Sequence, residues 1–408
     1  MAVPVPKVEI GFDIVGTNAP FLTLDDPTKG KLDDTNYPLS GSIFYDVTDK
    51  VKGITTRRGK NRQLDEFDAG LANVTLDNND RTFDPEYTLS PYAGQIVPKR
   101  SIRITSGNSL IFTGVIDDWN LNYEPGGNSE AQAAASDAFT LFNTQTLPAG
   151  TATAQKTGER INAILNLPDV DWPTDARNIE VGQTTIGADV YPEDGNVLQY
   201  LRTVANSEPG NLFMDAAGHV VFTDRSPNSD GSNLTFSDDG TGIPYQGLKV
   251  VYGSELLYNE IVLGSQFAGT FIAQDPTSIG EYGVLNLTQP DLLTADPVYL
   301  EKLAAYYAIK YSQPEYRFES LDIVLDELPT AQQNQILGLE IADYVTIKYT
   351  PNGIPPAIVK IAEIIRIDHD ISPEAHIVSF GFATVDKGFW TLSDGIFGRL
   401  SAGNVLGF

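Results

Sequence analysis

Alternating hydrophobic and polar residues mark several strands in the first third of the chain. In the segment 72–76 apolar residues alternate with polar ones, and the pattern recurs in 102–104 and 109–123. A period of two places the apolar side chains on one face of a strand, so that face is expected to be buried. The Pro-Gly-Gly turn after 109–123 predicts a hairpin that returns through the small residues of 130–136.

The middle of the chain changes to helical spacing. Segment 157–167 has apolar residues three and four positions apart, with Thr157 as a candidate N-cap and Arg160 on the predicted solvent side. Segment 195–206 repeats this spacing, and 211–225 has the pattern of a β-hairpin. Two short helices followed by a hairpin indicate a small inserted unit.

The second half returns to strand patterns, with one helix among them. In 296–311, Asp296 is a good N-cap and Pro297 suits the first turn, so a helix packed on a sheet is expected. The gaps between most of the following strand patterns are too short for parallel crossovers, so the sheet should be antiparallel. These patterns lie at 321–325, 345–349 and 378–382.

Together these elements predict a mainly β fold with an α+β insert. Two antiparallel β domains of the barrel or sandwich kind would flank smaller α/β parts. The predicted divisions are a first β domain at 1–148, a small α+β insert at 149–235, a second β-rich domain with one helix at 236–385, and a C-terminal arm at 386–408.

The C-terminal arm is apolar but too short and rich in glycine to form its own core. Such a segment is expected to dock on another surface, either elsewhere in the chain or on a neighbouring subunit. A final strand of the last domain is an equally good interpretation. The candidate docking residues are Phe389, Trp390, Phe397, Leu400, Leu406 and Phe408.

Charge and cysteine content limit the possible functions. The 408 residues include 54 acidic and 27 basic ones, which gives a formal net charge of −27. Such a surface repels nucleic acid, because affinity for phosphates comes from lysine and arginine, although simple solubility also explains the charge. The chain has no cysteine, which excludes disulfides and thiolate metal sites. No signal peptide or membrane-spanning run is recognisable, so a soluble protein made in the cytoplasm is expected.

Recognisable catalytic motifs are absent from the sequence. It contains no GxSxG, HExxH or GxxxxGK[ST] pattern, so no catalytic residue, metal ligand or cofactor is predicted. A two-histidine site at His369 and His376, beside Asp368 and Asp370, is conceivable, but exposed turn residues are the favoured interpretation. Paired carboxylates for sugar hydrolysis remain open, because their separation in space decides that function.

Two loops and one cluster have unusual charge. The acidic loops 77–86 and 228–240 could hold calcium, but turn formation explains them better because neither has EF-hand spacing. A basic cluster in one predicted hairpin could meet an acidic surface of a partner, or it could protect a solvated strand edge. Its members are Lys50, Lys52, Arg57, Arg58, Lys60 and Arg62.

A set of short motifs occurs in a characteristic order between Asp46 and Asp137. They are Asp46 and Thr48 of DVT; Arg57, Arg58 and Gly59 of RRG; Phe67 and Gly70 of FDAG; Leu76 and Asn78 of LDN; Phe83, Asp84 and Pro85 of RTFDP; Pro91 and Tyr92 of SPY; Gly114 and Trp119 of FTGVIDDW; and Asp137 of SDAFTLF. Glycines at 59 and 70 are expected at tight connections with positive φ. With FTDR at 222–225 and SIGEYG at 278–283, the series resembles minor tail proteins of long-tailed, siphovirus-type phages of actinobacteria.

This resemblance implies a non-enzymatic structural protein of the virion tail tip, similar to tail hub and distal-tail proteins. Two tail-tube-like β domains per subunit would form a hub-like ring, as a homotrimer, through which DNA passes without specific binding. The implied partners are the distal-tail ring, the tape measure protein and other minor tail or fibre proteins, with no cofactor and no membrane insertion. A hexameric distal-tail adaptor is the alternative, and a sugar-binding or cell-wall-degrading tip protein is a third.

Overall fold

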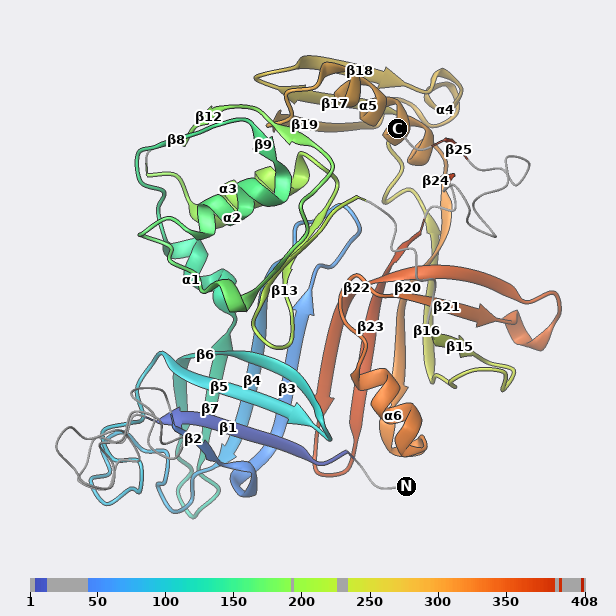
Figure 1. The fold of residues 1–408 in the computed structure, drawn as a ribbon. Coiled ribbons are helices and arrows are strands. Elements are labelled where there is room, and N and C mark those ends of the chain that lie inside the picture. The colour runs from blue at the N-terminus through green and yellow to red at the C-terminus, as the bar shows by residue number, and fades with distance from the viewer. Residues whose placement is uncertain are drawn as a thin grey trace.

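The fold is described from a computed structural model of the chain (Figure 1). The structure describes residues 4–12, 43–191, 194–225 and 234–385, together with the backbone of two short strands, β24 (Phe389–Trp390) and β25 (Val405–Leu406). All structural statements below refer to these parts of the chain.

One sheet of thirteen strands forms the body of the molecule and runs through both halves of the chain. The order along its main path is β16-β20-β23-β22-β3-β4-β7-β6-β5-β1-β2, and β21 and β15 continue from the first part of β22. The first-half strands are β1 (Pro6–Phe12), β2 (Ile43–Asp46), β3 (Val51–Gly59), β4 (Asp68–Asp77), β5 (Arg100–Ser106), β6 (Ser109–Asn122) and β7 (Glu130–Ser136). The second-half strands are β15 (Leu234–Ser237), β16 (Gly247–Gly253), β20 (Glu315–Val324), β21 (Tyr344–Tyr349), β22 (Ile358–Ile371) and β23 (His376–Thr384).

The two halves of this sheet have the same strand order. The first half runs β3-β4-β7-β6-β5-β1 and the second runs β16-β20-β23-β22-β21-β15. The long strands β6 and β22 each have 14 residues and occupy the same position in the two orders. One difference lies at the far end, where β1 is antiparallel to β5 but β15 is parallel to β21. The chain therefore contains the same β arrangement twice, joined into one sheet by the β3–β22 pair.

A helical insert follows β7 and packs beside the first half of the sheet. Its helices α2 and α3 lie against each other and α3 also contacts α1, while β14 pairs with β10 and β13. The helices are α1 (Ala138–Thr144), α2 (Thr157–Leu165) and α3 (Val197–Asn206). The strands are β8 (Thr151–Ala152), β9 (Gln155–Lys156), β10 (Arg177–Ile179), β11 (Thr185–Ile186), β12 (Asp189–Val190), β13 (Asn211–Met214) and β14 (Val220–Thr223).

The prediction that Arg160 faces solvent is wrong. Arg160, on α2, has no exposed surface. Its guanidinium donates hydrogen bonds to the Tyr200 hydroxyl at 2.7 Å and to the carbonyl oxygens of Thr153 and Gly187 at 2.9 and 2.8 Å. A buried arginine is tolerated because these acceptors replace its hydration. Arg160 therefore joins α2 to α3 and to two loops of the insert.

A second small unit interrupts the second half of the sheet between β16 and β20. Three strands form its sheet in the order β18-β17-β19, and α5 packs against β17 and β18. Asp296 caps α5 by accepting from the backbone N–H of Val298 at 2.9 Å, as the sequence predicted. The elements are β17 (Glu260–Ser265), β18 (Gly269–Gln274), α4 (Pro276–Tyr282), β19 (Asn286–Leu292) and α5 (Pro297–Lys310).

The sequence prediction of a mainly β fold with small helical inserts is confirmed. The predicted strands at 72–76, 102–104, 109–123 and 130–136 are all present, as are the three predicted helices, which are α2, α3 and α5. The sequence did not predict α1, α4, α6 (Thr330–Leu337) or the short 3₁₀ turns. These turns are η1 (Thr48–Lys50), η2 (Thr174–Ala176), η3 (Leu325–Glu327) and η4 (Pro351–Gly353).

Candidate assembly surfaces

The junction between the two halves is a six-residue antiparallel pairing of β3 with the last part of β22. On one face, Ile54, Thr56 and Arg58 of β3 stand opposite three residues of β22. Those residues are, in order, Ile371, His369 and Ile367. All six side chains are buried, with at most 5% of their surface exposed. This face therefore binds the halves through core packing, and β3 is an interior strand of the sheet.

Arg58 is the polar centre of the junction. Its Nη1 lies 2.7 Å from Oε1 of Glu340, and its Nε donates to the carbonyl oxygen of Ile111 at 3.2 Å. The other carboxylate oxygen of Glu340 accepts from the backbone N–H of Ala216 at 3.0 Å. A buried guanidinium needs such partners, because an unpaired charge in the interior is costly. Arg58 thus connects the first half, the helical insert and the second half.

The basic cluster predicted from the sequence contacts acidic residues of its own chain. Lys50 lies 2.6 Å from Asp80, and Arg62 lies 2.6 Å from Glu255, which follows β16. Desolvation lowers the pKa of Lys60 to about 8, and burial raises the pKa of the nearby Glu363 carboxyl. The alternative of a solvated strand edge is wrong for Arg57 and Arg58, because β3 pairs with β4 on one side and, over residues 54–59, with β22 on the other.

The histidine pair is buried, so the expectation of exposed turn residues is wrong. His369 and His376 lie on the adjoining strands β22 and β23, with Nδ1 of His369 3.0 Å from Nε2 of His376. Nδ1 of His376 also lies 3.2 Å from the Ser106 hydroxyl of β5. Burial holds the pKa of His369 well below its usual value and lowers the pKa of His376 to about 4. Both rings are therefore neutral at pH 7.

Several motif residues organise the loop between β4 and β5. The Asn78 side chain accepts from the backbone N–H of Phe83 at 2.9 Å, and Asp84 pairs with Arg81 at 2.7 Å. The fully buried Phe83 ring stacks on Trp119 of β6, with ring centroids 6.0 Å apart. Tyr92 stacks on Phe83, and Pro85 lines a cleft beside the loop. Of the other two motif residues here, Leu76 is buried and Pro91 is exposed. These residues hold the loop against β6.

The remaining motif residues fix turns and close approaches elsewhere. Asp46 accepts from the backbone N–H of Thr48 at 3.0 Å, and burial raises the pKa of Asp137, the N-cap of α1, to about 7. Gly70 lacks the predicted positive φ but donates to Asp137 at 2.6 Å, and a Cβ there would lie 2.7 Å from that carboxylate. A Cβ at Gly114 would lie 2.3 Å from a carbonyl oxygen of β7. Phe67 packs against Phe213 of the insert, and Arg57 faces Asp368 of β22. Gly59 has the predicted positive φ, 113°.

Besides the ends of the sheet at β2 and β15, two further edges have no paired neighbour among the described strands. Strand β16 pairs only with β20. Strand β6 pairs with β5 only as far as Ile116, so its last part, 117–122, has β7 on one side and no strand on the other. A cleft of about 670 Å³ opens beside this part and is lined by Leu121, Tyr123 and the loop residues Arg81, Asp84 and Pro85. Sequence patterns did not single out these edges.

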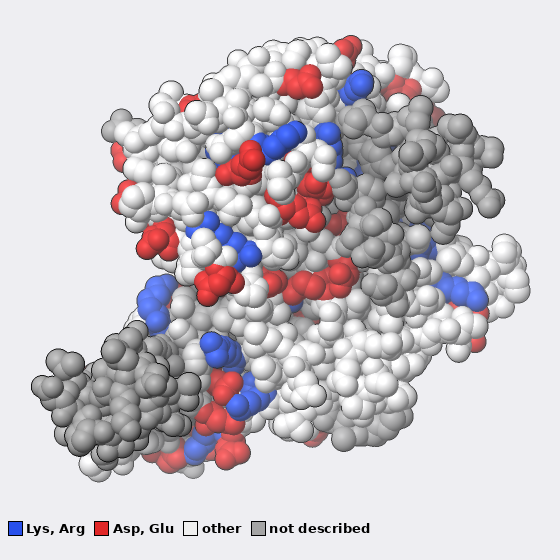
Figure 2. All heavy atoms as spheres, in the orientation of Figure 1, with Lys and Arg blue, Asp and Glu red and all other residues white. Residues whose placement is uncertain are grey.

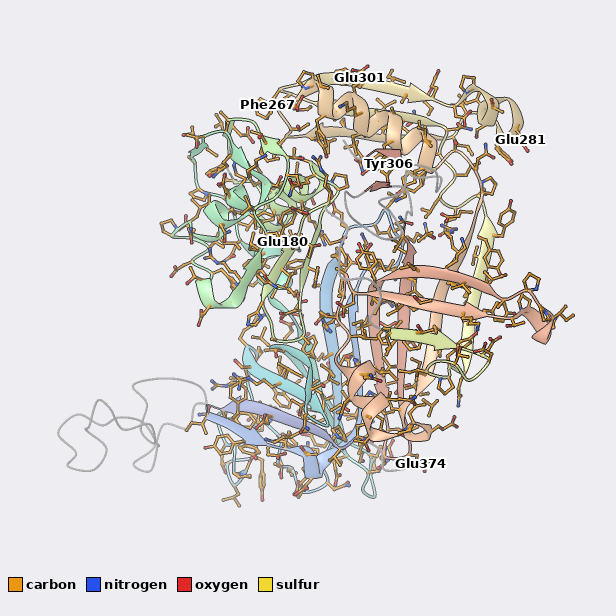
Figure 3. All side chains as sticks on the ribbon, turned by 45° about the vertical axis from the view of Figure 1, so that its right-hand side comes forward. Glu180, Phe267, Glu281, Glu301, Tyr306 and Glu374 are labelled. Atoms are coloured by element: carbon orange, nitrogen blue, oxygen red, sulfur yellow. The ribbon has the colours of Figure 1, made fainter. Side chains whose placement is uncertain are left out.

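An acidic cleft of about 460 Å³ separates the helical insert from β21 and β22. Figure 2 shows acidic side chains gathered near the centre of the face of the molecule that it displays, and Figure 3 places Glu180 on the insert. Burial raises the pKa of Asp343, which lies near Glu340. The carboxylates that line the cleft are Glu180, Asp215, Asp224, Glu340, Asp343 and Glu363. Part of the excess negative charge is therefore concentrated between the insert and the sheet.

The acidic loops and the arm are described only in part. Within 77–86, Asp80 accepts from the Thr82 hydroxyl of the same loop at 2.8 Å, in addition to its ion pair with Lys50. Across the described chain no three acidic or histidine side chains are grouped to hold a metal ion. Residues 228–233, Phe397, Leu400 and Phe408 lie outside the described residues. Phe389, Trp390 and Leu406 belong to β24 and β25, which pair with each other in parallel.

Comparison with solved structures identifies the fold. A tail protein from Neisseria meningitidis MC58 aligns with a TM-score of 0.59 at 11% identity, over 93% of this chain and 97% of its own. The 43 kDa tail protein of prophage MuSo2 from Shewanella oneidensis gives 0.59 at 13% identity, over 93% and 98%. A type VI secretion component from E. coli, described as similar to the T4 phage tail proteins gp27 and gp5, gives 0.50 at 9% identity, over 83% and 74%.

The chain therefore has the fold of phage tail proteins. Neither a protein-family model nor a curated protein matches the sequence. In the described part of the chain, none of the helices has the length and apolar character needed to cross a bilayer.

Proposed function

We propose that this chain is a structural, non-enzymatic subunit of the phage tail tip. Three copies would form a hub-like ring that closes or extends the tail tube and connects it to more distal tip proteins. The observation that carries the proposal is the repeated β arrangement joined into one sheet by β3 and β22. A chain with two equivalent β units contributes two units per copy, so three copies supply six positions around a channel.

The charge of the chain supports a role around passing DNA. With a formal charge of −27, the assembled ring would repel phosphates, and DNA could slide through it without binding. The acidic cleft between the insert and β22 shows that carboxylates gather on at least one face. Duplex DNA at low salt should accordingly show no retardation by the purified protein.

The motif series between Asp46 and Asp137 supports a more specific assignment. We propose that the phage is a long-tailed phage of actinobacteria and that the ring contacts the distal-tail ring and the tape measure protein. Residues 387–408 would dock on a neighbouring subunit. A variant lacking 387–408 should then lose assembly into particles, while a full-length chain with conservative substitutions in the exposed β22–β23 turn, such as Glu374→Gln, should assemble normally.

Copy number tests the proposal directly. Native mass measurement and averaged electron micrographs of the full-length protein should show closed rings of three copies with a central channel. Rings of six would instead support a distal-tail adaptor. A protein that stays monomeric at high concentration and has no place on the virion, or one that degrades host peptidoglycan or arabinogalactan, would contradict the structural role.

A further inference from the structure

The repeated β arrangement extends to individual residues. In β6 the pairing with β7 shifts register between Ile116 and Asp118, and in β22 the pairing with β23 shifts between Ile364 and Arg366. The two strands have 14 residues each, and the shifts lie within one residue of the same distance from the strand start, which indicates equivalent positions. Asp118 therefore corresponds to Arg366. Counting onward along both strands, 119, 121 and 123 correspond to 367, 369 and 371.

The same comparison aligns β3 with β16. Asn73 of β4 and Ser320 of β20 occupy equivalent places, because their partners, Ala134 in β7 and Gly381 in β23, lie opposite Asp118 and Arg366. Across the sheet, Asn73 faces Thr55 of β3, and Ser320 faces Lys249 of β16. Counting onward from these two residues, Ile54, Thr56, Arg58 and Gly59 of β3 correspond to Leu248, Val250, Tyr252 and Gly253 of β16.

The outer edges of β16 and of the last part of β6 are the counterparts of the two strands that join the halves. Inside the chain, β3 pairs with the last part of β22. The counterpart of β3 is β16, whose outer side has no strand among those described. The counterpart of the last part of β22 is 118–123, which is likewise unpaired on the side away from β7. One junction of the repeating pattern is thus formed within the chain, and the elements of a second one are present but not joined to each other.

We propose that β16 of one copy pairs with residues 118–123 of a second copy, antiparallel and in the register of the internal junction. Tyr252 of one copy then lies opposite Trp119 of the next, Val250 opposite Leu121, and Leu248 opposite Tyr123. The proposal rests on the proposed ring and names the surface through which its copies join.

The side chains of the two edges are complementary in this register. All six residues that meet on one face are apolar or aromatic, and two of them are unusually exposed for large side chains: Tyr252 at 68% and Tyr123 at 49%. Their counterparts at the internal junction are buried. Aromatic and β-branched residues directly opposite each other are favourable pairs in antiparallel sheets. Pairing between copies would therefore bury the side chains of β16 and 118–123, as the internal junction buries their counterparts in β3 and β22.

The space beside 118–123 also fits an incoming strand. At the internal junction, Arg58 of β3 lies against Ile367, His369 and the segment after α6 in a small cavity of about 100 Å³. At the corresponding place in the first half, the cleft beside Leu121 and Tyr123 is open, with about 670 Å³ of space. Side chains from β16 of another copy would occupy this cleft, as the Arg58 side chain of β3 occupies the cavity at the internal junction.

Such a contact uses the β16 edge of one copy and the 118–123 edge of the other, so the joined pair still presents one unpaired edge of each kind. A contact of this type forms a closed ring when its rotation divides a full turn, and an open helical polymer otherwise. If the rotation between neighbouring copies equals the rotation between the two halves of one chain, the junctions between copies have the same geometry as the internal β3–β22 junction.

A disulfide cross-link tests the register. The chain has no cysteine, so the full-length double variant Asn120→Cys with Val251→Cys carries thiols only at two positions predicted to be opposite. Mild oxidation should convert most of it into covalent dimers and trimers, with the linked peptide visible by mass spectrometry. The matched control, Asp118→Cys with Val251→Cys, is two residues out of register and beyond the roughly 7 Å Cα separation that a disulfide spans, so it should link at least about tenfold less.

A charge substitution tests the surface independently. Tyr252→Asp should weaken association by at least about tenfold, because it places a carboxylate in an apolar contact. Ile272→Asp is the control, since Ile272 is 64% exposed on β18, away from both edges, and should leave association unchanged. Unchanged circular dichroism in both variants would show that the fold is intact.

The outcomes separate this inference from the proposed function. If rings form although the Asn120→Cys, Val251→Cys variant gives no disulfide between copies, or if rings survive Tyr252→Asp, the proposed strand pairing is wrong and the proposed ring stands. The specific link in open chains without rings supports the pairing and contradicts the hub. Specific linking within rings supports both, and a protein that is monomeric under all conditions contradicts both.

Discussion

At the scale of single residues, neighbours in the sequence have opposite environments at the junction. Arg57 keeps 54% of its side chain exposed and lies 3.9 Å from Asp368, whereas only 4% of Arg58 is exposed and it is bonded to Glu340. An exposed ion pair at such a distance contributes little, because water and salt screen it. A buried one is costly to break, because its partner is left without compensation.

We therefore expect Arg58→Ala to destabilise the protein by about 3 kcal/mol or more and Arg57→Ala by less than about 1 kcal/mol. Arg58→Lys should fall between them, since an ammonium cannot reproduce the planar set of donors. Urea unfolding monitored by circular dichroism measures the difference. Equal losses for Arg57→Ala and Arg58→Ala would show that Arg58 has no special role.

The histidine pair predicts a pH dependence of stability. Because burial lowers the pKa of His376 to about 4, the folded ring stays neutral while the unfolded one takes up a proton below its ordinary value near 6.5. Stability is thus complete above pH 6.5 and is lost as the pH falls toward 4, by about 3 kcal/mol for this one group. His369 acts in the same direction.

Melting temperatures of the wild type and His376→Gln between pH 7.5 and 4 measure this dependence. The variant should be less stable at pH 7.5, where it loses the contacts to His369 and Ser106, but its stability should fall less on acidification. Parallel curves for wild type and His376→Gln would refute the assignment.

At the scale of elements, the close approach of β3 to β22 requires glycine at one end of the pairing. Gly59 has a φ of 113°, and a Cβ there would lie 2.2 Å from the carbonyl oxygen of Ile365. Its counterpart Gly253 pairs with Glu315 of β20 but has no described strand on its outer side, and a Cβ there would lie no closer than 3.9 Å to any neighbour. The same position in the repeat is thus crowded where strands are joined and open where they are not.

Gly59→Ala should consequently destabilise the isolated chain by about 2 kcal/mol or more, since both the backbone conformation and the contact oppose a methyl group. Gly253→Ala should change the unfolding free energy of the monomer by less than about 1 kcal/mol. Thermal unfolding of the two variants at low protein concentration provides the comparison. A harmless Gly59→Ala would mean that β22 moves aside easily.

Elements with a strong local pattern were predictable from the sequence. The alternation in 72–76 and the capped, apolar face of 296–311 predicted β4 and α5, because period and capping are local properties. Burial of polar residues was not predictable. Arg160 and His369 look solvent-facing in sequence, and only their tertiary partners, such as Tyr200 and His376, make burial possible.

The candidate site was predictable only in part. The sequence favoured turn formation for the loop 77–86, and the structure stacks Phe83 of this loop on Trp119 of β6. The pairing of β3 with β22 joins segments about three hundred residues apart in the chain, and no local pattern encodes such a contact. The importance of Tyr252 follows only from its equivalence to Arg58, which requires the strand register of both halves.

At the scale of the whole molecule, the described residues form two hydrophobic cores of unequal extent. The larger core includes residues of both halves of the sheet and of the helical insert, among them Ile54, Val204 and Ile367. The smaller one lies in the unit between β16 and β20, around Leu263, Leu300 and its neighbours on α5. Because cooperative unfolding follows shared core packing, the two halves should unfold together and the small unit should be able to open separately.

Hydrogen exchange of two matched variants tests this division. Ile54→Ala removes a buried side chain, 1% exposed, at the β3–β22 junction, and Leu300→Ala removes a fully buried one from α5. Each should cost about 2–5 kcal/mol within its own core. Ile54→Ala should therefore speed amide exchange in β3 and β4 and equally in β22 and β23, although these strands belong to opposite ends of the chain. Leu300→Ala should speed exchange in α5 and β17–β19 while the main sheet keeps its protection. If Ile54→Ala affected the first half alone, the halves would be independent domains in contact, and a ring built from them would lack the rigid repeating unit that a shared sheet provides.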